Sequence, residues 1–254
     1  MKNKILLALA AAGTAVAMLP LFAAFEAHVV NVTATIENAL SVPLEQNSLN
    51  FGTTFPQEAF DKNIDLTLSQ SFIAQNRVNV VDYMIRQKPK CGIPVPNTSP
   101  TTYSSFPLVT EDANGNFVCP NGSQMLPLLC PYLSKHEITT DGDGNNDSAG
   151  INSFHGFPLP WTSTTTLNTQ VKGELNQAIH DVSDKWSIDL HVPCFRGSCA
   201  QDWATFVHSQ NPDADPNLYM GDPSQEHQMF GCDLWLETTG ISASTSTPPN
   251  LPPA

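Results

Sequence analysis

Oxygen-bearing side chains between residues 141 and 147 have the spacing of a calcium-binding loop. They occupy every second position, at Asp141, Asp143, Asn145 and Asp147. Side chains that alternate in this way turn toward a common centre and bind a hard cation such as Ca²⁺ through oxygen. The EF-hand pattern is incomplete, because Asn146 replaces the turn glycine and Asn152 replaces the bidentate glutamate. We expect a weak, structural calcium site completed by ligands from elsewhere; the alternative is a solvated acidic turn.

The seven histidines match no known catalytic motif. The chain contains neither His-Glu-x-x-His, the helical zinc-protease pattern, nor Gly-x-Ser-x-Gly, the nucleophile elbow. A secreted metal-dependent hydrolase would have to assemble scattered side chains, such as His191, His208, Glu226 and His227. A zinc site could instead use His191, Cys194, Cys199 and His208, although this spacing fits no common zinc motif.

The cysteines favour disulfides over metal binding or nucleophilic chemistry. Six are present: Cys91, Cys119, Cys130, Cys194, Cys199 and Cys232. An even number in an exported chain predicts up to three disulfides and an oxidising compartment. The sequence does not choose among the possible pairings, although Cys194 and Cys199 are close enough to close a local loop.

The N-terminus has the pattern of a signal peptide. Lys2 and Lys4 precede an uncharged apolar run over residues 5–22, and small residues follow. We prefer cleavage after Ala24, before Phe25; a second small-x-small match lies at residues 15–17. The prediction is a secreted or cell-surface protein, with an uncleaved anchor as the alternative.

The composition excludes several classes of protein. The net charge of −13 argues against a nucleic-acid binder and against docking on an anionic membrane, since both need basic surfaces. The 21 prolines and 14 glycines argue against a coiled coil or a simple helical bundle. Charged residues are only 14% of the chain, against about 25% in an average domain, so uncharged polar side chains must supply much of the surface.

Alternation of apolar and polar residues predicts a chain built mainly of strands. The expected strands cover residues 29–40, 49–55, 63–73, 77–87, 186–192 and 228–239. Apolar residues at helical spacing predict a helix over 167–182, and a second is expected over 198–208 with Ser198 as its cap. Two of the four tryptophans, Trp186 and Trp235, fall in expected strands and are assigned to the core; a glycan-binding face is the alternative.

These elements predict a mainly antiparallel β-sandwich with one or two short helices. Prolines and two cysteines cluster between residues 88 and 165, which predicts a long insertion held by disulfides. The sandwich domain is expected over 25–241. Residues 242–254 are almost entirely Ser, Thr, Pro and Asn, and are expected to form a disordered tail.

The start of the chain resembles one family. The export segment ends Leu21-Phe22-Ala23-Ala24, and an alternating strand follows from Val29 to Val42. In this the chain resembles the TasA/camelysin group of exported biofilm-matrix and surface fibre proteins, whose signal peptides are removed after a small-residue pair and before an aromatic residue. The resemblance covers about the first 50 residues and implies a jelly-roll-like sandwich. The six cysteines and the insertion depart from the simpler members, and no zinc motif matches the metallopeptidase label that some members carry.

The resemblance also implies a means of assembly. In fibre-forming members the new N-terminal segment pairs as a strand with the neighbouring subunit. Here residues 25–43 would be donated, and the side chains filling the neighbour's core would be Val30, Val32, Ala34 and Ile36. We therefore predict a structural, non-enzymatic role with self-association or other matrix proteins as partners, and no cofactor other than calcium. A calcium-stabilised adhesin or glycan-binding module and a secreted hydrolase are the alternatives.

Overall fold

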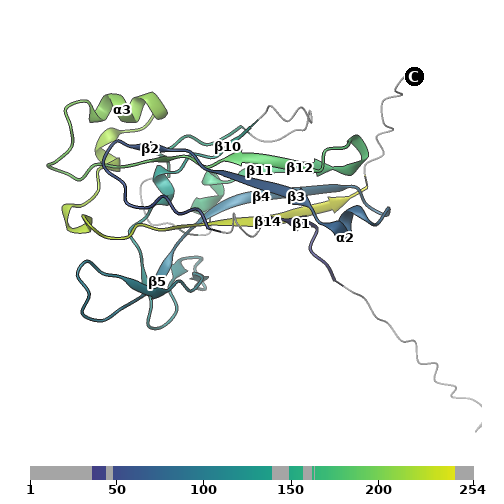
Figure 1. Cartoon of the computed structure of the whole chain (residues 1–254), viewed down its shortest axis with the longest axis horizontal. Helices are drawn as coiled ribbons and strands as arrows, with labels where there is room; N and C mark the ends of the chain where they lie inside the picture. Colours follow the sequence, from purple (N-terminus) through teal and green to yellow (C-terminus); the bar gives the residue numbers. More distant parts are fainter. Residues whose placement is uncertain (1–35, 44–47, 139–148, 157–161, 163, 244–254) are drawn as a thin grey trace, which may run out of the picture. The chain divides into compact units, whose positions relative to one another are not determined.

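The computed structural model describes residues 36–43, 48–138, 149–156, 162 and 164–243. Residues 37–254 make up one compact unit, and the first 36 residues make up another. In the described part of the larger unit, the strands lie in two main layers (Figure 1).

The first sheet contains four strands in the order β1-β3-β12-β10, all antiparallel. Their bounds are β1 (Leu40–Ser41), β3 (Asn63–Leu68), β12 (Ser183–Ser187) and β10 (His136–Glu137). Strands β2 (Ala59–Phe60) and β13 (Leu190–His191) pair with each other and continue the β3–β12 pairing in the same register. Lys62 and Ile188, which lie between the two strand pairs, exchange backbone hydrogen bonds of 3.3 and 2.6 Å. Residues 58–68 therefore run against residues 182–192 as one continuous ladder.

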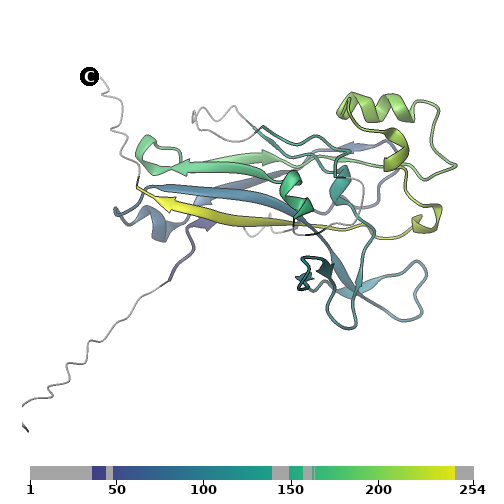
Figure 2. The same cartoon turned by 180° about the vertical axis from the view of Figure 1, so that it is seen from behind.

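The second sheet places β4 (Val80–Pro89) between β11 (Val171–Asn176) and β14 (Cys232–Ser242). Both pairings are antiparallel, and a bulge interrupts β14 between Thr238 and Gly240. Strand β4 turns its odd-numbered side chains inward, so Val81, Tyr83 and Ile85 are almost fully buried. Figure 2 shows β4 and β14 side by side from behind.

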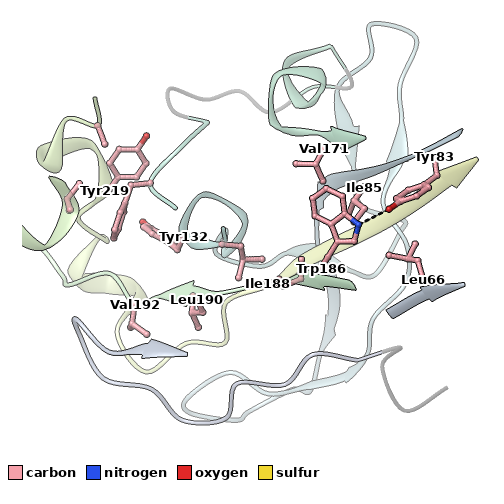
Figure 3. Close-up of a cluster of buried hydrophobic side chains, with 14 of the residues drawn as sticks. Leu66, Tyr83, Ile85, Tyr132, Val171, Trp186, Ile188, Leu190, Val192 and Tyr219 are labelled. Atoms are coloured by element: carbon pink, nitrogen blue, oxygen red, sulfur yellow. Dashed lines mark hydrogen bonds between the residues drawn. The ribbon is translucent and has the colours of Figure 1, made fainter. Parts of the chain in front are cut away.

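The core lies between these two sheets. Leu66, Trp186 and Ile188 from the first sheet belong to one buried cluster with Tyr83 and Val171 from the second. Figure 3 shows the indole of Trp186 pointing toward Tyr83, and its Nε1 donates a hydrogen bond of 2.7 Å to the Tyr83 hydroxyl. The two layers are thus joined by apolar contact and by a buried polar link, which confirms a mainly antiparallel β architecture.

A satellite of short strands follows β4 along the chain. Its members are β5 (Cys91–Pro94), β6 (Tyr103–Ser105), β7 (Thr110–Glu111), β8 (Phe117–Val118) and β9 (Gln124–Met125). Strand β5 pairs with both β6 and β9, while β7 pairs with β8. The satellite has its own small buried cluster, formed by Cys91, Val109, Phe117 and Cys130. Tyr132, Leu133 and Phe154, which lie within the range 88–165 of the expected insertion, belong to the main core.

The described part of the chain has two α-helices, α2 (Gln70–Ile73) and α3 (Trp203–Gln210). Short 3₁₀ helices occur at η3 (Cys130–Tyr132), η5 (Thr165–Thr169), η6 (Gln177–Ile179), η7 (Pro216–Tyr219) and η8 (Pro223–Gln225). Helix α3 buries Trp203 and Val207, and Trp203 meets the ring of Phe154 edge-on at a centroid distance of 5.6 Å. In the described residues, no helix is long and apolar enough to cross a membrane.

The helix predicted over 167–182 is wrong. This segment contains η5, strand β11 and η6, because Val171, Gly173 and Leu175 face inward at strand spacing while Lys172 is exposed. A Cβ at Gly173 would lie 2.2 Å from the Tyr83 ring, so the residue that weakens a helix here lets two strands approach closely.

The predicted cap at Ser198 is also wrong. Helix α3 begins at Trp203, and Asp202 occupies its N-cap position.

Local turns change three predicted strands. The expected strand over 49–55 is absent, because the Asn50 side chain accepts a hydrogen bond from the Gly52 amide and fixes a turn. The strand expected over 63–73 stops at Leu68, because Ser69 caps α2 by accepting from the Phe72 amide at 3.1 Å. The last strand begins at Cys232 rather than 228.

The predicted strand over 77–87 corresponds to β4, and the one over 186–192 is divided between β12 and β13. Of the strand predicted over 29–40, residues 29–35 lie outside the described residues, and the first strand of the structure is β1. The signal peptide and residues 244–254 of the predicted tail also lie outside them.

Candidate functional site

All six cysteines form disulfides, as predicted. The pairs are Cys91–Cys119, Cys130–Cys232 and Cys194–Cys199. Cys91–Cys119 closes the satellite, and Cys130–Cys232 joins η3 to the start of β14. Three disulfides indicate a non-reducing, extracellular environment. The alternative zinc site is wrong, because two of its four ligands, Cys194 and Cys199, are bonded to each other.

The residues proposed for a metal-dependent hydrolase are not brought together as a metal site. His191 is buried in β13, and His208 lies on the exposed side of α3. Glu226 and His227 follow η8 in the chain and have exposed side chains. Nε2 of His227 lies 3.9 Å from Oε1 of Glu226. Across the described ranges, no group of three or more His, Cys, Asp or Glu side chains is placed to hold a metal ion.

Glu226 and His227 do line a hollow. Its volume is about 340 Å³, and its opposite wall is the turn Thr98–Ser99–Pro100–Thr101. Hydroxyl groups, a carboxylate, an imidazole and the Gln228 amide thus surround one space. The lining is mixed, because Pro100 adds apolar surface to these polar groups, and the hollow opens widely to solvent.

The predicted calcium residues, Asp141, Asp143, Asn145 and Asp147, lie outside the described residues. The structure does describe the chain on each side of them. We call residues 133–138 the first arm and residues 149–156 the second arm. Lys135 and Ile151 exchange backbone hydrogen bonds of 2.8 Å between the arms. The first arm also pairs with β12 and β13, which makes it an outer strand of the first sheet.

Two polar contacts in this region were not found from the sequence. The hydroxyl of Ser153 lies 2.8 Å from Nδ1 of His191. Burial lowers the pKa of His191, and the nearby carboxylates of Asp189 and Asp61 oppose this shift. A serine bonded to a neutral imidazole has the chemistry of a nucleophile and its base. Ser153 is only 1% exposed, however, so this pair braces the core and is closed to a substrate.

The second contact is a cluster of Lys135 and Gln87, both buried, with the partly exposed His155, which we call the Lys135 cluster. Lys135 extends from the first arm and is fully buried, and its Nζ has no hydrogen-bond partner in the described structure. Burial lowers the pKa of Lys135 to about 7. His155 extends from the second arm, and its Nε2 lies 2.9 Å from Oε1 of Gln87 on β4. Burial and the nearby Lys135 lower the pKa of His155 to about 3.

Little in the sequence marks these residues as neighbours in the fold. Lys135 and Glu137 alternate with Ser134 and His136, so both faces of the first arm are polar and the inward face cannot be identified. The assignment of the tryptophans to the core is confirmed for Trp186 and Trp203 and wrong for Trp235, while Trp161 lies outside the described residues. Trp235 lies on the outer face of the second sheet, under the ammonium group of Lys88.

Of the predicted donor strand, only Ile36 is described, and it is 94% exposed; Val30, Val32 and Ala34 lie outside the described residues.

No protein family, curated protein or solved structure matches this chain.

Proposed function

We propose that the protein is an exported structural component of a cell surface or extracellular matrix, which assembles by strand donation between subunits. The observation that carries this proposal is that the chain just before the sandwich is weakly paired and has an exposed apolar side chain. Strand β1 pairs with only Leu68 and Thr67 of β3. Ile36, immediately before Glu37 of the compact unit, is 94% exposed. Burying such a side chain in a neighbour is favourable by about 2 kcal/mol.

The sandwich and its disulfides support the proposal. A disulfide-braced β-sandwich suits a durable protein outside the cell, because cross-links limit the unfolded state that proteases attack. The architecture is also compatible with the jelly-roll-like fold of the TasA/camelysin group, to which we propose a relationship. In this relationship the satellite is a disulfide-held insertion between strands of the sandwich.

Contacts within the subunit set the bounds of the segment that we propose is donated. Residues 25–43 were expected to leave their own subunit, but Leu40 and Ser41 form β1. The preceding carbonyls of Asn38 and Ala39 also accept hydrogen bonds from the Ser69 hydroxyl and amide, at 2.6 and 2.7 Å. The donated segment in our proposal is therefore residues 25–36, and a deletion that spares residues 37–43 leaves these contacts intact.

Electron microscopy of the oxidised, concentrated chain from Phe25 to Ala254 tests the proposal. We expect regular fibres, and we expect deletion of residues 25–36 to abolish them while the melting temperature remains unchanged. Val32→Asp should have the same effect, because it places a charge on the apolar face of the donated strand. The matched control is Thr33→Asp, which places the same charge on the opposite face and should leave assembly intact.

Dispersed monomers in every condition would overturn the proposal. Loss of folding in Val32→Asp would also oppose it, because the strand would then belong to its own subunit. Microscopy with and without calcium would show whether the cation affects assembly.

The polar groups in the lining of the hollow beside Glu226 favour a second candidate function, a glycan-binding module stabilised by calcium. Sugars are bound by convergent hydroxyl, amide and carboxylate groups such as those of Thr98, Gln228 and Glu226. Screening the intact protein against a glycan array tests this function, with Glu226→Gln and Gln228→Ala expected to reduce any signal at least tenfold. A calcium-dependent rise in melting temperature that Asp143→Asn removes would support the predicted cation site.

A further inference from the structure

Strand β14 has the longest open edge of the two main sheets in the described part of the chain. It has 11 residues and pairs only with β4, which leaves its other side without a neighbouring strand. The other edge strands are shorter, since β1 and β10 have two residues each and β11 has six. Among the described residues, no backbone hydrogen bond reaches the outer side of β14. An open edge of this length can accept a strand from another chain.

A proline on β4 shows which backbone groups face the open side of β14. Pro89 pairs with Cys232 but has no N–H, so these two residues cannot exchange hydrogen bonds. Hydrogen-bonded and non-bonded pairs alternate along an antiparallel ladder, so the odd-numbered residues of β14 before its bulge bond to β4. The amide and carbonyl groups of the even-numbered residues therefore point to the open edge; these residues are Leu234, Leu236 and Thr238.

Two leucines that face the core are incompletely covered at this edge. Leu234 and Leu236 pack against the main core, yet both remain partly exposed. Their partners on β4, Gln87 and Ile85, are at most 1% exposed. Burial thus decreases across one layer of the sheet, from its middle strand to its edge. A further strand beside β14 would cover both leucines, and the burial of apolar surface favours its addition.

The N-terminal segment of a second copy fits this edge in length and in pattern. Residues 25–36, which we propose are donated, make a segment about as long as the 11-residue β14. The apolar residues of its second half alternate with polar ones and are Val30, Val32, Ala34 and Ile36. One face of the added strand would therefore continue the apolar layer of the two leucines, and the other face would meet water.

Charge favours this occupant over a second copy of β14. The outer face of β14 carries two carboxylates, Asp233 and Glu237, which form ion pairs with cations of the same subunit. Two β14 strands placed edge to edge would bring the carboxylates of both subunits close together, and like charges on facing strands are destabilising. Residues 25–36 contain a single acidic residue, Glu26, in a chain of net charge −13. This segment can therefore approach the edge with less repulsion.

We propose that the open edge of β14 is the acceptor for residues 25–36 of the neighbouring subunit, so that the three-stranded sheet gains a fourth strand. This inference rests on the proposed strand donation and adds the place where the donated strand binds. The backbone groups of Leu234, Leu236 and Thr238 form the new hydrogen bonds. The bulge that follows Thr238 ends the regular part of the acceptor edge.

Disulfide trapping locates the acceptor edge. All six native cysteines are paired, so introduced cysteines supply the free thiols. Ala34→Cys is combined in turn with one cysteine at each open position of β14, and the concentrated protein is oxidised mildly. We expect at least one combination to give a covalent ladder on a non-reducing gel; the three partners are Leu234→Cys, Leu236→Cys and Thr238→Cys.

Two controls show whether the cross-links are specific to β14. Ala34→Cys combined with Lys172→Cys places the second thiol on β11, the opposite edge of the same sheet. This combination should give at least tenfold less ladder. Leu236→Cys alone tests the pairing of two β14 strands. A covalent dimer from this single variant, in place of the ladder, would overturn the proposal.

A proline variant tests the backbone hydrogen bonds. Because the amide of Thr238 points to the open edge, Thr238→Pro removes a donor for the incoming strand but none for β4. We expect the amount of fibre that sediments to fall at least tenfold, while the melting temperature of the subunit is unchanged. The control Thr238→Val keeps the amide and should assemble like the wild type.

The outcomes separate this inference from the proposed function. Wild-type fibres together with cross-links at Lys172→Cys, or fibres from folded Thr238→Pro, would overturn β14 as the acceptor and leave strand donation intact. An absence of wild-type fibres would overturn both. If Thr238→Pro does not fold, the cross-links decide the question.

Discussion

The indole nitrogen of Trp186 donates a 2.7 Å hydrogen bond to the hydroxyl of Tyr83, across the gap between the two main sheets. That hydroxyl also donates to the carboxylate of Asp184, two residues from Trp186 on the same strand. Each of the three side chains is at most 1% exposed. A single hydroxyl thus satisfies a donor and an acceptor at the centre of the core, where water cannot replace it.

Tyr83→Phe should therefore lower the free energy of unfolding by about 1–3 kcal/mol, because it leaves a buried donor and a buried carboxylate without this hydroxyl. Denaturant unfolding followed by tryptophan fluorescence measures the change. The control is Tyr103→Phe, which removes a hydroxyl bonded to the exposed Gln124 side chain. Surface substitutions usually change the free energy of unfolding by no more than about 0.5 kcal/mol, so the loss at Tyr103 should be below that value. Equal effects at the two positions would contradict the role given to the Tyr83 hydroxyl.

Glu237 connects two cations on the outer face of the second sheet. Its carboxylate lies 3.2 Å from Nη1 of Arg86 and 3.5 Å from Nζ of Lys88, and both cationic side chains are largely buried. Glu237→Gln should cost about 1–3 kcal/mol, since it removes one negative charge from two partly desolvated positive charges. Glu226→Gln is the matched control, because Glu226 and its neighbour His227 both have exposed side chains. We expect the control to show the smaller loss in chemical denaturation, and the reverse order would disprove the argument.

The disulfides should contribute unequally to stability. Cys130–Cys232 joins residues 102 apart, whereas Cys194–Cys199 joins residues 5 apart. In the chain-entropy account these loops correspond to about 5 and about 2 kcal/mol. Replacing each pair with alanine should therefore lower the melting temperature much more for the long loop. Calorimetry on the two double variants tests this, and equal shifts would show that loop entropy does not set the difference.

The stability of the whole domain should depend on pH through Lys135. Its pKa is lowered on folding, so the unfolded chain binds the extra proton between pH 10.5 and about 7, and stability falls as the pH falls through that interval. Between pH 9 and 7 the loss is about 2–3 kcal/mol at 1.36 kcal/mol per unit. Lys135→Met should be more stable than the wild type at pH 7 and should flatten this part of the profile. Denaturant midpoints at several pH values provide the measurement; an unchanged profile in the variant would assign the dependence to other groups.

The sequence predicted the β-rich architecture because alternation in segments such as residues 63–68 is strong. It mispredicted residues 167–182 because Leu167, Val171, Leu175 and Ile179 are four apart, a spacing compatible with both a helix and alternate positions of a strand. The decisive fact was the approach of Gly173 to the Tyr83 ring, a contact between segments 90 residues apart. The Lys135 cluster could not be predicted for the same reason: its three members come from separate segments, and nothing local to any of them marks it as buried.

The continuous ladder between residues 58–68 and 182–192 has a consequence for biosynthesis. Both main sheets pair early strands with late ones, since β3 needs β12 and β4 needs β11 and β14. The ordered interior therefore cannot form while the chain is still being made, and contacts of such high sequence separation fold slowly. Until its last strand has been synthesised, the chain therefore stays unfolded and able to pass through a narrow pore. Its long-range disulfide, Cys130–Cys232, can form only after Cys232 is present.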